Sequence, residues 1–136
     1  MEVLTLERTL TELDHVRLLS LARRQRPGVA AAAIEPLLDA CTVVPSRQVR
    51  PDVVTMYSQV LLQDLASGLR SRLTLCYPAD AEPAAGFVSV LSPVGCSLLG
   101  LTVGAVARWS TPSGEARSAE VVALLFQPEA SGDYAM

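Results

Sequence analysis

The sequence predicts an α+β protein, with a short antiparallel helical hairpin followed by an antiparallel β-sheet that carries one short helix. The first 45 residues place apolar side chains at helical spacing on both sides of a Pro27-Gly28 turn. From Asp52 onward, apolar and β-branched runs alternate with turns rich in glycine, serine and proline. These patterns divide the chain into a hairpin (1–45), a linker (46–51) and a β-domain (52–136).

Two helices are expected in the hairpin. The first covers 11–24, where Thr11 and Asp14 have the spacing of a capping box. The second covers 29–43 and begins with four alanines, which are strong helix formers. Pro36 leaves its start open, because proline inside a helix either kinks it or requires a later beginning. We expect this hairpin to stand clear of the β-domain.

The β-domain is expected to contain five or six antiparallel strands. Serine is a good N-cap and proline fits the first helical position, so Ser92 and Pro93 open a short helix. The expected strands are 53–56, 58–65, 69–77, 87–91, 105–110 and 115–126, with the helix over 93–99.

Composition limits the class of protein. Half of the 136 residues are hydrophobic and 18% are charged, so a core can form. No apolar run reaches the roughly 18–20 residues that span a bilayer. The beginning of the sequence has glutamates where a signal peptide has basic residues, so we expect a cytoplasmic protein with no membrane partner.

The residue types exclude several chemistries. The chain has no lysine and no P-loop motif, and its net charge of −3 is unlike that of a general nucleic-acid binder. Cys41, Cys76, Cys96 and His15 are too scattered for a zinc site, and the cysteines are expected to be small buried side chains. No metal, cofactor or small-molecule substrate is therefore expected.

Three blocks of the sequence resemble the C-terminal domain of the bacterial Gre transcript-cleavage factors. The blocks are Asp52-Val53-Val54-Thr55-Met56, Tyr77-Pro78-Ala79 and the segment SPVGCSLLGLTVG at 92–104. The tail from Gln127 to Tyr134 is most similar to the short branch of that family, the regulators of nucleoside diphosphate kinase. The resemblance implies a domain similar to that of FK506-binding prolyl isomerases, and RNA polymerase as the partner. Family members have aspartate after the glycine of the helix–strand turn, whereas Ala105 follows Gly104 here.

The hairpin tip departs from the family pattern. Gre factors insert a long helical hairpin into the secondary channel of RNA polymerase, where two acidic residues at the tip help to hold a catalytic magnesium ion. Magnesium prefers oxygen ligands, but the tip here reads Arg23-Arg24-Gln25-Arg26-Pro27-Gly28 and has no carboxylate. An arm of about 13 residues also extends only about 20 Å. We therefore expect a non-enzymatic regulator that binds near the secondary channel and competes with Gre factors without cleaving transcripts.

Eight residues are candidates for partner contacts: Arg23, Arg24, Arg26, Asp52, Ser92, Pro93, Asp133 and Tyr134. The arginine cluster suits an acidic protein surface or a nucleic-acid backbone, but a solvated helix end is the favoured explanation. One alternative function is a peptidyl-prolyl isomerase with an aromatic pocket that includes Trp109, although core packing is expected for these rings. Another is a homodimeric scaffold paired through the hairpin. Any effect on nucleoside diphosphate kinase is expected to be indirect.

Overall fold

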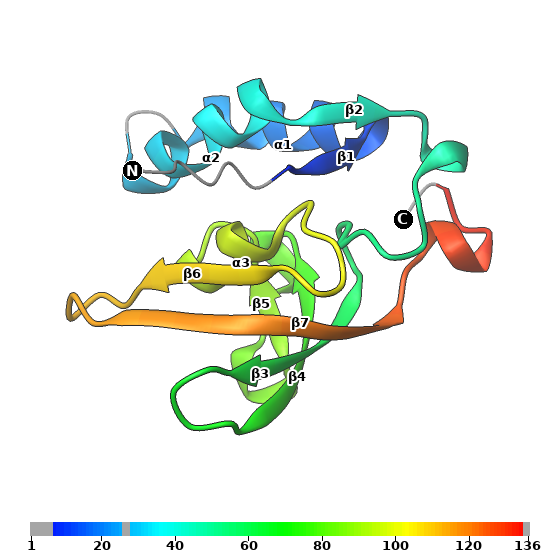
Figure 1. Cartoon of the computed structure of the whole chain (residues 1–136). Helices are drawn as coiled ribbons and strands as arrows, with labels where there is room; N and C mark the ends of the chain where they lie inside the picture. The colour runs from blue at the N-terminus through cyan, green and yellow to red at the C-terminus, as the bar shows by residue number, and fades with distance from the viewer. Residues whose placement is uncertain (1–6, 26–27, 135–136) are drawn as a thin grey trace, which may run out of the picture.

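The computed structural model describes residues 7–25 and 28–134 (Figure 1). Two helices and a small strand pair form one layer, and a five-stranded sheet with one short helix lies beneath it. The structure confirms the α+β class. It also confirms both β-hairpins that the turn residues predicted, which are β3 (Gln59–Asp64) with β4 (Arg70–Cys76), and β6 (Val106–Ser110) with β7 (Ala116–Phe126).

The N-terminal part is more than a helical hairpin. Helix α1 (Glu12–Arg24) and α2 (Val29–Ala40) are flanked by β1 (Thr9–Thr11) and β2 (Thr42–Val44), which pair in parallel. Helix α2 starts directly after Gly28 and runs through Pro36. The expected extension of the second helix to residue 43 is wrong. The β-branched residues Thr42 and Val43 belong to β2 and pair with β1 instead.

The five-stranded sheet has the order β5-β4-β3-β7-β6. The expectation of a purely antiparallel sheet is wrong, because β5 (Phe87–Ser89) runs parallel to β4. Residues 77–86 contain two short 3₁₀ turns and return the chain to the same end of the sheet before β5 begins. Helix α3 (Pro93–Leu98) follows and packs beside β6. The strand expected at 53–56 is reduced to a single bridge between Val53 and Thr102.

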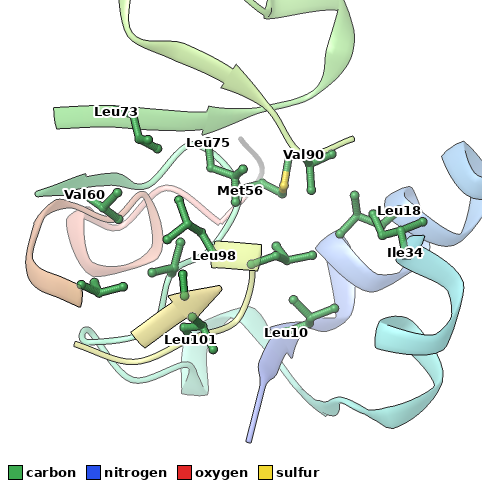
Figure 2. Close-up of a cluster of buried hydrophobic side chains, with 14 of the residues drawn as sticks. Leu10, Leu18, Ile34, Met56, Val60, Leu73, Leu75, Val90, Leu98 and Leu101 are labelled. Carbon is green, nitrogen blue, oxygen red and sulfur yellow. The ribbon is translucent and has the colours of Figure 1, made fainter. Parts of the chain in front are cut away.

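One hydrophobic core joins the two layers. Leu10, Leu18 and Ile34 come from the helical layer and belong to the same buried cluster as residues of the sheet and α3. Figure 2 shows Leu18 and Ile34 facing the side of the core that holds Met56 and Val90. The expectation that the hairpin stands clear of the β-domain is therefore wrong, since burying these apolar side chains stabilises the packed arrangement.

Candidate functional site

The candidate partner residues lie in three separate regions, one of which is the start of α3 with Ser92 and Pro93. Arg23 and Arg24 are exposed at the end of α1, whereas Arg26 lies outside the described residues. Asp52 directly follows the linker, and Asp133 and Tyr134 belong to the C-terminal tail. The linker and the tail lie at the opposite end of the helical layer (Figure 1).

Contacts within the chain account for the linker and tail candidates. Arg50 forms an exposed ion pair of 2.9 Å with Asp52. The guanidinium of Arg47 lies 5.0 Å from the centre of the Tyr134 ring. The backbone N–H of Asp133 donates to the carbonyl of Pro128 at 2.9 Å. Of these three contacts, only the one between Arg47 and Tyr134 joins the linker to the tail. Exposed ion pairs such as that of Arg50 and Asp52 contribute little to stability.

Ser92 and Pro93 open α3 as the sequence predicted. The Ser92 hydroxyl accepts the backbone N–H of Gly95 at 3.1 Å and donates to the carbonyl of Ser89 at 2.7 Å. The hydroxyl therefore has a structural role, and the exposed Pro93 ring is the part of this motif that a partner can reach.

Residues 53–56, which follow Asp52, are buried in the interior of the molecule. Val53, Val54, Thr55 and Met56 are each at most 1% exposed. The tail reaches back to this block, because the Thr55 hydroxyl donates to Glu129 Oε1 at 2.7 Å. These residues, which carry part of the family resemblance, therefore have a structural role in the fold, whatever they contribute to function.

Asp14 connects α1 to these buried residues. Its backbone N–H donates to Thr11 Oγ1 at 3.1 Å, which confirms the predicted cap. Its carboxylate does not complete the box but accepts the N–H of Met56 at 3.1 Å. Burial raises the pKa of Asp14 to about 7, the charge of Glu129 adds to the rise, and the Met56 bond and the charge of Arg17 oppose it.

A cleft of about 750 Å³ lies between α1 and two tyrosines, one just before β3 and one just after β4. Its α1 wall includes Val16, Arg17 and Arg24, and the opposite wall includes Tyr57 and Tyr77. The ring centroids of the tyrosines are 5.8 Å apart, with the planes tilted by 57°. Both tyrosines also pack against the hydrophobic core, so the expected core role holds for these two rings, which line the cleft as well. The cleft joins elements far apart in sequence, which is why pattern reasoning missed it.

Tyr57, which lines the cleft, has an unusual backbone conformation. It is in the left-handed region at φ 65°, which is uncommon for any residue other than glycine. Its N–H donates to the Leu75 carbonyl and its hydroxyl donates to Asp80 Oδ2 at 2.5 Å. Burial and the Asp80 carboxylate raise the pKa of Tyr57 to about 12. These two hydrogen bonds hold the ring at the edge of the cleft. A backbone conformation as rare as that of Tyr57 is often found at functional sites.

Tyr57 also lines a smaller hollow of about 330 Å³. Gln59, Thr74, Phe87 and Phe126 line it together with Tyr57. Phe87 and Phe126 are 38% and 41% exposed, so they are not core residues. Trp109, by contrast, packs against the core cluster.

The remaining candidate groups do not form a reactive centre in the described part of the chain. No three His, Cys, Asp or Glu side chains there lie close enough to hold a metal ion. Cys76 is buried, Cys41 and Cys96 are half-buried, and all three are free, with burial raising their thiol pKa values. His15 lies between the helices, with Nε2 3.1 Å from the Leu38 carbonyl. Among the described helices, none combines the length and apolar character needed to cross a bilayer.

The α+β fold is similar to that of solved Gre-factor structures. Residues 48–125 match the family described as "Transcription elongation factor, GreA/GreB, C-term", and the chain belongs to this family. It is 41% identical over 104 residues to the regulator of nucleoside diphosphate kinase of Escherichia coli K12, covering 76% of each chain. It is also 33% identical over 116 residues to the transcription elongation factor GreA of Solidesulfovibrio magneticus, covering 82% of this chain and 70% of that one.

A solved structure gives the same result. The chain is similar to the prokaryotic transcription elongation factor GreA/GreB from Nitrosomonas europaea, with a TM-score of 0.74 and 30% sequence identity. The match covers 90% of this chain and 100% of that one. The family resemblance read from the sequence is thus confirmed.

Proposed function

We propose that this protein is a non-enzymatic transcription regulator that binds RNA polymerase near the secondary channel. Membership of the GreA/GreB family supports the partner, because Gre factors act on that enzyme. The observation that carries the rest of the proposal is the hairpin tip, where residues 23–28 include three arginines and no carboxylate. Proteins bind magnesium mainly through carboxylates, and a tip without carboxylates lacks the groups with which Gre factors hold that ion.

The arm is also too short for the catalytic role of a Gre factor. Helix α1 has 13 residues, which corresponds to about 20 Å, and its apolar side is packed into the core. The regulator would therefore occupy the polymerase without reaching its active centre. Two proteins that share a docking domain compete by mass action, so this chain would displace Gre factors.

A cleavage assay on backtracked polymerase complexes tests both parts of this proposal. The protein alone should leave cleavage at the level of the polymerase itself. Added in excess over a Gre factor, it should reduce factor-stimulated cleavage in proportion to its occupancy. Stimulation of cleavage by the protein alone would contradict the first part, and unchanged Gre activity at saturation would contradict the second.

The name of the E. coli relative refers to nucleoside diphosphate kinase. We propose that any corresponding effect of this protein is indirect and acts through transcription. Mixing the purified protein with nucleoside diphosphate kinase should then leave the kinase rate unchanged, and a direct change in that rate would contradict this view.

A further inference from the structure

Two carboxyl groups from opposite ends of the chain meet the same pair of consecutive buried residues. Asp14 comes from α1, and its carboxyl group accepts the backbone N–H of Met56 at 3.1 Å. Glu129 comes from the tail, where it begins the short 3₁₀ turn Glu129–Ser131, and its Oε1 accepts the hydroxyl of Thr55 at 2.7 Å. Thr55 and Met56 therefore attach both α1 and the tail turn to the interior of the molecule.

The two carboxyl groups differ in how firmly they are held. Asp14 is 1% exposed, and the apolar side of α1 belongs to the shared core, so Asp14 can leave its place only if the helix moves. Glu129 is half-buried on a surface turn, and the Thr55 hydroxyl ties its carboxylate to the interior. Water can replace this hydrogen bond, because a hydrogen bond that is exchanged with water contributes little net free energy. Of the two groups, Glu129 is the one that can move easily.

The charged and titratable groups that face Asp14 come from three elements. Arg17 lies on the next turn of α1, and its charge favours the ionised form of Asp14. Glu129 opposes ionisation from the tail, because its charge repels a second carboxylate. Tyr77 lies just after β4, where burial and the charge of Asp14 raise the pKa of its hydroxyl, so this group stays neutral while Asp14 titrates. Glu129 is therefore the group that an ionised Asp14 repels.

Loss of the proton from Asp14 has opposite effects on the two contacts. The ionised carboxylate accepts the Met56 N–H more strongly, so Asp14 stays in place. The same negative charge repels Glu129, whose carboxylate can turn outward to solvent. This movement does not leave the Thr55 hydroxyl unpaired, because it also lies 2.9 Å from Ser58 Oγ and can share a hydrogen bond with it.

We infer that Asp14 and Glu129 form a pH-sensitive latch, in which loss of the Asp14 proton releases the tail turn from Thr55. While Asp14 is neutral, the contact between Glu129 and Thr55 stays closed. As the pH rises and Asp14 ionises, the turn opens, and it closes again when the proton returns. The latch belongs to the protein alone, so it holds or fails independently of RNA polymerase binding.

The movement is confined to the end of the chain. The buried side-chain amide of Gln127 donates to two backbone carbonyls of the segment 50–53, each at 2.8 Å. This anchor does not titrate, so it holds the start of the tail at every pH. The released segment begins at Glu129 and carries Asp133 and Tyr134, two of the candidate residues for partner contacts. The latch would thus make the position of these two residues depend on pH.

Nuclear magnetic resonance of the folded protein between pH 5 and pH 8 tests the latch. The reporters are the carboxyl carbon of Asp14 and the backbone amide of Gly132, which donates to the Glu129 carbonyl at 3.1 Å. In the unmodified protein, the Gly132 amide should shift with the same midpoint as the Asp14 carboxyl carbon. The nuclear Overhauser effect between the Thr55 methyl group and the Glu129 side chain should weaken at least about twofold above this midpoint, because the open state becomes populated.

Two variants remove the trigger and the responding charge separately. Asp14→Asn cannot ionise, so the Gly132 amide should show no step near pH 7 and the contact between Thr55 and Glu129 should persist to pH 8. Glu129→Gln keeps an oxygen that can accept the Thr55 hydroxyl but removes the repulsion. The turn should then stay closed, and the midpoint of Asp14 should fall by roughly half a pH unit.

The matched control is Glu115→Gln. It removes an exposed carboxylate from the turn between β6 and β7, which lies at the other end of the molecule from the tail (Figure 1). This variant should change neither the midpoint of Asp14 nor the signals of the tail.

The outcomes decide the inference in either direction. If Asp14 titrates while the Gly132 amide and the contact between Thr55 and Glu129 stay constant, the latch is wrong. A step that persists in Asp14→Asn also overturns it, because another group would then open the turn. Should Asp14→Asn fail to fold, Glu129→Gln decides the question by itself, and an unchanged Asp14 midpoint in that variant overturns the latch.

Discussion

The substitution Asp14→Asn should remove a large part of the pH dependence of the free energy of unfolding. Asp14 is 1% exposed, and its pKa is raised from 3.8 to about 7, mainly by burial. A carboxyl group whose pKa is higher in the folded state binds its proton more tightly there. The free energy of unfolding therefore falls as pH rises from the unfolded value towards 7, and it levels off above that.

The size of the effect follows from the shift. About three pH units at 1.36 kcal/mol each amount to about 4 kcal/mol in all, of which roughly 2–3 kcal/mol is lost between pH 5 and pH 8. In Asp14→Asn the amide oxygen can still accept the Met56 N–H, but no proton is taken up or released. The stability of the variant relative to the unmodified protein should therefore increase by roughly 2–3 kcal/mol over this range.

Urea unfolding at a series of pH values measures this difference. The single tryptophan, Trp109, is half-buried and reports unfolding by its fluorescence. Asp39→Asn, an exposed change on α2, is the control and should give a curve parallel to that of the unmodified protein. A constant difference between Asp14→Asn and the unmodified protein from pH 5 to pH 8 would refute the reasoning. The charges of Glu129 and Arg17 act on Asp14, so variants of these two residues should shift the midpoint of the pH dependence.

Three further predictions concern stability and reactivity. Gly95→Ala would place Cβ 2.0 Å from the Ser89 carbonyl oxygen, and we expect it to lower the free energy of chemical unfolding by about 1–3 kcal/mol. The control is Gly114→Ala, whose added Cβ meets open space. It should cost about 1 kcal/mol, because the backbone there is at φ +87°. Arg8 donates to three carbonyls around the end of α3, so Arg8→Ala should cost about 2–4 kcal/mol, and an unchanged melting temperature would contradict this. The Cys76 thiol is buried with a raised pKa, so it should react with a disulfide reagent many times more slowly in the native protein than in urea, and equal rates would show that it is accessible.

The sequence alone determined the elements whose signals are local. Thr11 and Ser92 cap helices as predicted, because a hydroxyl three residues before a backbone N–H needs no distant partner. Both β-hairpins formed around their predicted turns for the same reason. The absence of acidic residues from the hairpin tip, on which the proposed lack of cleavage rests, is likewise a property of the sequence.

Tertiary structure decided the features that depend on residues far apart in the chain. Parallel pairing of Thr9–Thr11 with Thr42–Val44 ended α2 early, and no local pattern shows a partner more than 30 positions away. The sequence predicted Asp14 as part of a helix cap, but in the folded protein its carboxyl group is buried and accepts the N–H of Met56, 42 residues away. The cleft beside Tyr57 exists only because α1 packs against the C-terminal part, and burial of one shared core holds the two together.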